Sequence, residues 1–106
     1  MTQEKQKRWG RAVYTVQDSD KETREIVLMG RDRWALEMLI LAGPRGLTAI
    51  EMNGPRLHAY VFDLRHEHGL TIIREDEPHG GDFPGRHGRY FLRSKVARKA
   101  TQPVAA

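Results

Sequence analysis

The chain has 106 residues, which is enough for a single domain with a modest hydrophobic core. Its hydrophobic fraction of 39% and charged fraction of 30% are typical of a globular protein rather than a disordered one. No apolar run reaches the roughly 18 residues that a membrane span needs. The opening sequence MTQEKQKRW also lacks the apolar core of a signal peptide. The sequence therefore predicts a cytoplasmic protein that does not enter a membrane.

Charge and cysteine content narrow the class of partner. The chain has no cysteine, so disulfides and thiolate chemistry are excluded. The net charge is +4, and from Arg86 onward there are six basic residues and no acidic one. A basic domain favours nucleic acid or another polyanion as its partner.

The N-terminal third contains two strand-like runs. We expect residues 1–10 to form a flexible basic tail, in which Trp9 either touches nucleic acid or belongs to an unstructured arm. β-branched and aromatic residues predict strands over Arg11–Gln17 and Arg24–Met29, with a turn at residues 18–23. Together they predict an N-terminal β-hairpin over residues 11–29.

A helix is predicted over Arg33–Ala42, capped by Asp32, because this run contains mainly good helix formers. Its apolar residues surround most of the helix, which indicates burial on two sides. One arc holds Trp34, Ala35, Met38, Leu41 and Ala42, and the other holds Leu36 and Ile40. We expect a later helix to cover one side and the hairpin to cover the other. A second copy of the chain or a partner protein, bound through this helix or the hairpin, is the alternative cover.

Two further helices are predicted after the Gly-Pro break at residues 43–46. A capping box of Thr48 and Glu51 indicates a short helix, preceded by a very short strand at Leu47. The stretch Asn53–Gly69 then has an N-cap, a proline at the first helical position and a terminating glycine. Its apolar residues follow the spacing of a single helical stripe: Leu57, Tyr60, Val61 and Leu64.

The C-terminal part predicts a second hairpin. Strands are expected over Leu70–Asp76 and Arg89–Ser94, and the many glycines and prolines of Pro78–Gly88 predict a long loop between them. We expect residues 96–106 to form a flexible tail.

Three segments resemble small bacterial and phage-type winged helix-turn-helix domains: RWALEMLILAGPRGLT, LHAYVFDLRHEHGLTI and HGRYFL. The resemblance extends from about Arg31 to Ser94. It implies an α+β fold, with a three-helix core and a β-hairpin wing over residues 30–95, to which the N-terminal hairpin is added. It also implies binding of double-stranded DNA by a small transcriptional regulator or phage-type accessory protein, with the third helix in the major groove.

Two departures from the winged-helix pattern concern the second helix and the wing. The second helix is unusually short, and the wing region contains Asp82 and the acidic run Glu75–Glu77, which disfavours phosphate. Winged helices also act as protein–protein interaction modules, so a module that does not bind DNA is the alternative function.

The candidate DNA-binding residues lie on the central helix and the wing. On the helix they are Arg56, His58, Ala59, Phe62, Arg65 and His66, and on the wing they are Arg86, His87 and Arg89. Arginine suits guanine or phosphate, and the smaller and aromatic side chains suit base edges or thymine methyl groups. The alternative is that these residues form a solvated helix face and a flexible loop.

Catalytic, cofactor and metal sites are not expected. The chain lacks cysteine and a G-x-S-x-G motif, so we predict no enzyme. His66 and His68 diverge by about 200° on a helix and cannot share a metal. His79, His87 and Asp82 form a weak metal candidate, because zinc normally takes four ligands in another spacing.

Overall fold

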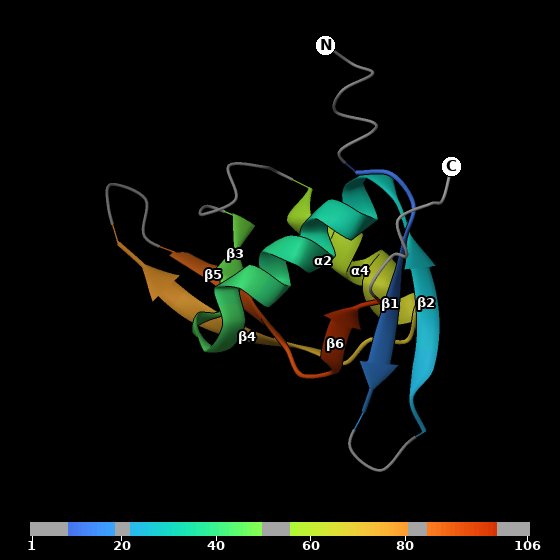
Figure 1. Cartoon of the computed structure of the whole chain (residues 1–106). Helices are drawn as coiled ribbons and strands as arrows, with labels where there is room; N and C mark the ends of the chain where they lie inside the picture. Colours follow the sequence, from blue (N-terminus) through green and yellow to red (C-terminus); the bar gives the residue numbers. More distant parts are fainter. Residues whose placement is uncertain (1–8, 19–21, 50–55, 81–84, 100–106) are drawn as a thin grey trace.

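The computed structural model of the chain describes residues 9–18, 22–49, 56–80 and 85–99, apart from the side chains of His79 and Arg86 (Figure 1). The described residues form two helices, one 3-10 turn and six strands in two sheets. In chain order these are β1 (Ala12–Gln17), β2 (Arg24–Leu28), α2 (Gly30–Ala42), η1 (Gly43–Arg45), β3 (Leu47–Thr48), α4 (Leu57–His66), β4 (Ile72–His79), β5 (Gly85–Leu92) and β6 (Lys95–Arg98). No helix among them is long and apolar enough to cross a membrane.

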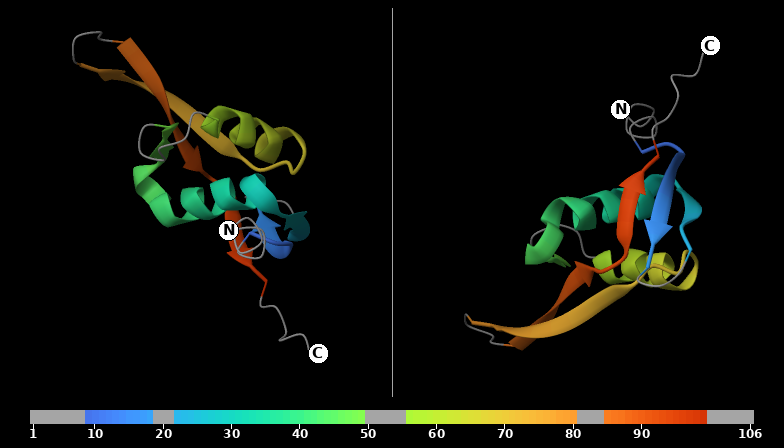
Figure 2. Two further views of the ribbon diagram at one scale, coloured as in Figure 1. Left: turned by 90° about the horizontal axis from the view of Figure 1, so that it is seen from above. Right: turned by 60° about the horizontal axis from the view of Figure 1, so that its bottom comes forward.

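The two antiparallel sheets lie on opposite sides of the helices (Figures 1 and 2). One sheet has the strand order β2-β1-β6, and the other has the order β3-β5-β4. The far end of the β4–β5 hairpin extends beyond the helices, on the side away from β1 and β2. Buried side chains from both sheets and both helices form one hydrophobic core.

The predicted N-terminal hairpin is confirmed. β1 and β2 pair from Ala12 opposite Leu28 to Val16 opposite Arg24. Alternate side chains of the hairpin point into the core, as the two-residue period of a strand requires: Ala12, Tyr14, Val16, Ile26 and Leu28. The hairpin is thus half-buried and contributes one wall of the core.

Residues 96–98, which we expected in a flexible tail, instead belong to strand β6. β6 pairs with β1 from Tyr14 opposite Arg98 to Gln17 opposite Lys95. Unpaired N–H and C=O groups along the open edge of β1 favour such an additional strand. Val96 packs against the core. The prediction failed because four residues with one β-branched side chain give too weak a strand signal.

Helix α2 begins at Gly30, three residues earlier than predicted, and Asp32 is not its cap. Met29 occupies the N-cap position without a side-chain hydrogen bond, and Asp32 lies in the first turn. The Gly30 N–H donates to the carbonyl of Trp9 at 2.7 Å, so a tertiary contact satisfies this end of the helix.

The two predicted apolar arcs of α2 are only partly correct. Its buried apolar residues form one stripe: Ala35, Leu36, Leu39 and Ala42. Leu41 is 78% exposed, and Trp34 is half-buried with its ring 6.2 Å from that of Tyr60. Because neighbouring elements cover only part of a helix surface, an apolar residue outside that part remains in contact with solvent.

The β1–β2 hairpin covers only part of the side of α2 that was expected to face it, because Leu36 is buried whereas Ile40 is 37% exposed. The Tyr14 hydroxyl of β1 donates to Glu37. The Arg33 side chain, which is only 9% exposed, donates to Tyr14 Oη at 3.2 Å and to the Gly10 carbonyl at 2.7 Å. Its guanidinium also lies 5.7 Å from the centre of the Trp9 ring. Trp9 and Gly10 therefore contact α2 rather than extending the tail.

The β4–β5 hairpin is longer, and its loop shorter, than predicted. The short strand at Leu47 is confirmed as β3, which pairs with β5. The β4–β5 ladder continues to His79 opposite Gly85, so the predicted loop over Pro78–Gly88 is wrong at both ends. Pro78 is tolerated within the ladder because β4 is an edge strand. Gly88 leaves room for the Arg74 side chain, which lies where a Cβ at position 88 would be. Asp82 lies outside the described residues.

Helix α4 is the described part of the central stretch. It spans Leu57–His66, and Leu57, Val61 and Leu64 are buried as their spacing predicted. Gly69 has the expected positive φ of 66° after the helix. The predicted caps at Asn53 and Pro55, and most of the short helix from Thr48, fall on residues 50–55, outside the described residues. The described part of the chain thus contains two of the three helices expected for the core.

Candidate nucleic-acid interface

The outward face of α4 is exposed and carries several polar side chains. Because Leu57, Val61 and Leu64 fix one side of the helix in the core, the opposite side faces solvent. Five of the six candidate residues on this helix are exposed: Arg56, His58, Phe62, Arg65 and His66. The sixth, Ala59, is half-buried.

The aromatic residues of this face are arranged along one line of the helix. Phe62 is 58% exposed, although it is large and apolar. Its ring stacks on that of His66 with 4.1 Å between the ring centres and 33° between the planes. His58 lies one turn before Phe62, and its Nδ1 is 3.5 Å from the hydroxyl of Tyr90 on β5. The face thus presents an aromatic stripe that reaches toward the second sheet.

Two wing candidates, His87 and Arg89, are held by the carboxylate of Glu77, a pairing that the sequence did not predict. Glu77 on β4 contacts His87 Nε2 at 2.7 Å. It also accepts hydrogen bonds from Arg89 Nε at 2.9 Å and Arg89 Nη2 at 2.8 Å. The hydrogen bonds from Arg89, and then that from His87, lower the pKa of Glu77 to about 2. Glu77 is therefore ionised at neutral pH and offsets positive charge on this hairpin.

This cluster of Glu77, His87 and Arg89, here called the wing clasp, also reaches η1. Arg89 Nη1 donates to the carbonyl of Arg45 at 3.3 Å. The side chains of His87 and Arg89 are only 22% and 21% exposed. The third wing candidate, Arg86, lies opposite Pro78 in the ladder, but its side chain is outside the described part of the structure.

The base of the β4–β5 hairpin is connected to the β2-β1-β6 sheet by polar contacts. Ser94 donates to Asp18, and the Thr71 N–H donates to Ser94 Oγ at 2.9 Å. Asp18 also pairs with Arg24 at 3.1 Å. These hydrogen bonds, with that of Ser94 the largest influence, lower the pKa of Asp18. These contacts therefore fix the base of the β4–β5 hairpin to the rest of the domain.

Helices α2 and α4, the short strand β3 between them and the long β4–β5 hairpin after them define a winged-helix arrangement. A family model described as a winged helix domain matches residues 25–102, and the chain belongs to this family. The match begins within β2 and passes beyond β6, so it reaches further than the stretch on which the resemblance was based. No curated protein and no solved structure matches the chain.

Proposed function

We propose that the protein binds double-stranded DNA by placing α4 in the major groove. The observation that supports this most directly is the uncovered face of α4, which presents two arginines and two histidines around one exposed aromatic ring. In helix-turn-helix proteins the N-terminal part of the recognition helix contacts base edges. Arg56 and His58 lie at that end of α4.

Each candidate side chain on α4 has a role that matches its chemistry. Arg56 suits a bidentate contact with guanine or a salt-bridged phosphate. His58 and Phe62 face base edges and thymine methyl groups, and the small Ala59 allows close approach of the helix. Arg65 and His66, in the last turn of α4, contact the phosphate backbone.

The wing contributes a weaker contact in this proposal. Arg86, His87 and Arg89 approach the backbone or the minor groove, but Glu77 already neutralises part of their charge. Specificity then depends on α4, and the wing mainly orients the domain. A single domain of this size buries a modest area on DNA, so a regulator of transcription or a phage-type accessory protein would act as a dimer or with a partner.

Salt-dependent binding to duplex DNA tests the proposal. Fluorescence anisotropy with a mixed-sequence duplex between 50 and 200 mM salt should give a steep loss of affinity. The double variant Arg56→Ala/Arg65→Ala should bind more weakly, and its log–log salt slope should be shallower by about 0.9 for each of the two arginines that contacts a phosphate. The double variant Lys95→Ala/Arg98→Ala removes the same charge from exposed positions on β6 and is the matched control. Undetectable binding at low salt would rule out the DNA proposal.

A protein–protein module is the second candidate, and one observation favours it. Leu41 on α2 is 78% exposed, and the adjacent Ile40 is 37% exposed. Such neighbouring apolar side chains suit docking to another protein or a second copy of the chain. Size-exclusion chromatography with light scattering, on wild type and Leu41→Ser, separates the two candidates. A dimer that Leu41→Ser disrupts, together with no DNA binding at low salt, would favour the protein module.

A further inference from the structure

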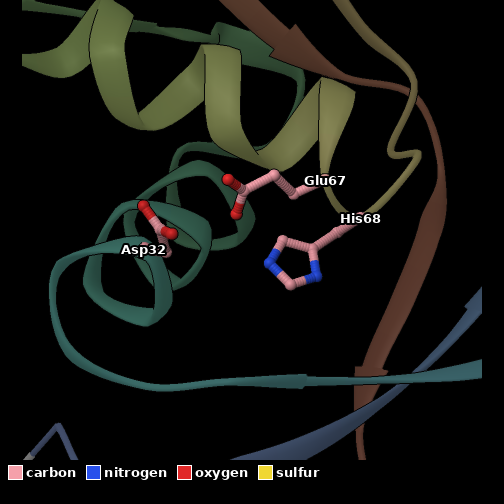
Figure 3. Close-up of side chains that lie close together, drawn as sticks. All are labelled: Asp32, Glu67 and His68. Atoms are coloured by element: carbon pink, nitrogen blue, oxygen red, sulfur yellow. The ribbon is translucent and has the colours of Figure 1, made fainter.

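A second polar cluster joins the start of α2 to the end of α4. It consists of Asp32 in the first turn of α2, Glu67 at the C-cap of α4, and His68 directly after it. Figure 3 shows the three side chains directed toward a common point between the helices. One ligand atom from each residue lies within 4.8 Å of the other two.

We propose that Asp32, Glu67 and His68 bind a divalent transition-metal ion of the Zn²⁺ class. One imidazole and two carboxylates are a ligand set that zinc accepts, with water completing the coordination shell. Three atoms within 4.8 Å of one another have a common point that is no more than about 2.8 Å from each of them. Zinc–ligand bonds are about 2.0–2.2 Å long, so small rotamer changes would bring the three ligand atoms to bonding distance of an ion at that point.

The local charge favours a cation. Asp63, one turn before Glu67, adds a third carboxylate near Asp32. Among the described side chains, none of the three carboxylates takes part in an ion pair with lysine or arginine. The C-terminal end of α4 adds the partial negative charge of a helix terminus.

The backbone that presents the imidazole is held independently of the cluster. Arg24 Nη2 donates to the carbonyls of both His68 and Gly69 at 2.9 Å. The same guanidinium pairs with Asp18 through Nη1, so both of its terminal nitrogens are bound to oxygen atoms. This support fixes the turn after α4 and limits the rearrangement that metal binding requires.

A bound metal would connect the start of α2 to the end of α4. These helices otherwise meet through the core, and the cluster lies beyond the buried stripe of α4. Metal binding should therefore stabilise the folded chain and hold the orientation of α4. This inference does not depend on the DNA proposal, because its test involves no DNA.

Thermal unfolding and isothermal titration calorimetry of the metal-free full chain, with Zn²⁺, Mg²⁺ and Ca²⁺ as separate probes, test the site. Zn²⁺ should raise the melting temperature and bind with one-to-one stoichiometry, whereas Mg²⁺ and Ca²⁺ should have little effect. Asp32→Asn and His68→Ala should each weaken Zn²⁺ binding at least about tenfold, since each removes one of three protein ligands. His66→Ala removes an exposed imidazole two residues away and should leave Zn²⁺ binding unchanged.

Asp32→Asn also separates loss of the site from loss of the fold. It keeps the shape of the side chain and removes the charge of one of the two neighbouring carboxylates of the cluster, so without metal it should melt at or above the wild-type temperature. The proposal is overturned if Zn²⁺ does not bind, if Asp32→Asn and His68→Ala bind it as wild type does, or if Mg²⁺ and Ca²⁺ stabilise the chain equally. The last result would indicate a general acidic surface instead of a coordination site.

Discussion

Replacing Glu77 by glutamine should strengthen DNA binding by releasing the wing clasp. Glu77 accepts two hydrogen bonds from Arg89 and contacts His87, so both side chains are directed toward a carboxylate instead of solvent. Glutamine retains one oxygen acceptor but no charge, so it holds the guanidinium less strongly. Arg89 then becomes available to a phosphate beside the wing.

The size of the effect follows from counterion release. One additional phosphate contact should steepen the log–log salt dependence by about 0.9, so that affinity falls by a further factor of about 3.5 between 50 and 200 mM salt. Fluorescence anisotropy titrations of the same duplex at four or more salt concentrations would measure this slope.

A matched control distinguishes release of Arg89 from a change in net charge. Glu25 on β2 pairs with Lys99 at 2.7 Å, in the other sheet. Glu25→Gln therefore adds the same net charge and frees a cation away from the wing. An unchanged slope of log affinity against log salt, or weaker DNA binding by Glu77→Gln, would refute the reasoning. The wing clasp would then stabilise the shape of the wing without holding Arg89 away from DNA.

Three further changes test the fold that presents α4. Leu64→Ala, at a fully buried position, should destabilise the domain by about 2–5 kcal/mol, measured as a lower urea midpoint at unchanged slope; a loss below 0.5 kcal/mol, on the order of a surface substitution, would contradict its core position. Gly46→Ala should cost about 1–3 kcal/mol in the same assay, because Gly46 has φ 75° and ψ 178° and a Cβ would lie 2.7 Å from the Phe91 ring; wild-type stability would contradict this geometry. Because the pKa of Asp18 is lowered in the folded chain, its ionised carboxylate should stabilise the fold at pH values above the unfolded pKa, near 3.8. This stabilisation should be lost as the pH falls through the folded pKa. Asp18→Asn should therefore flatten the acid limb of a melting-temperature profile, and an unchanged limb would assign the acid sensitivity to other groups.

Local spacing was sufficient to predict the elements that depend on a single helix or hairpin. The stripe of Leu57, Val61 and Leu64 repeats at the helical period, and all three residues are buried. The β1–β2 hairpin and the short strand at Leu47 were likewise predicted from residues close together in sequence.

Features that depend on distant residues were not predicted. Arg33 is buried because Tyr14 and Gly10 supply acceptors from another element, which no local pattern indicates. The wing clasp depends on the register between β4 and β5, and the glycine-rich sequence obscured how far that register continues. Asp32, Glu67 and His68 are likewise brought together only by the crossing of α2 and α4.

Strand β6 has a consequence for how the chain folds during synthesis. Thr15 Oγ1 donates to the carbonyl of Ala97, which lies 82 positions later in the sequence. Because a chain is synthesised from its N-terminus, the residues of β1 and β2 are available long before those of β6. A two-stranded hairpin is marginal alone, and the β1 edge stays open to pairing with other chains during this interval. Completion of the first sheet is therefore among the last steps of folding, and truncation before Lys95 would leave that edge permanently exposed.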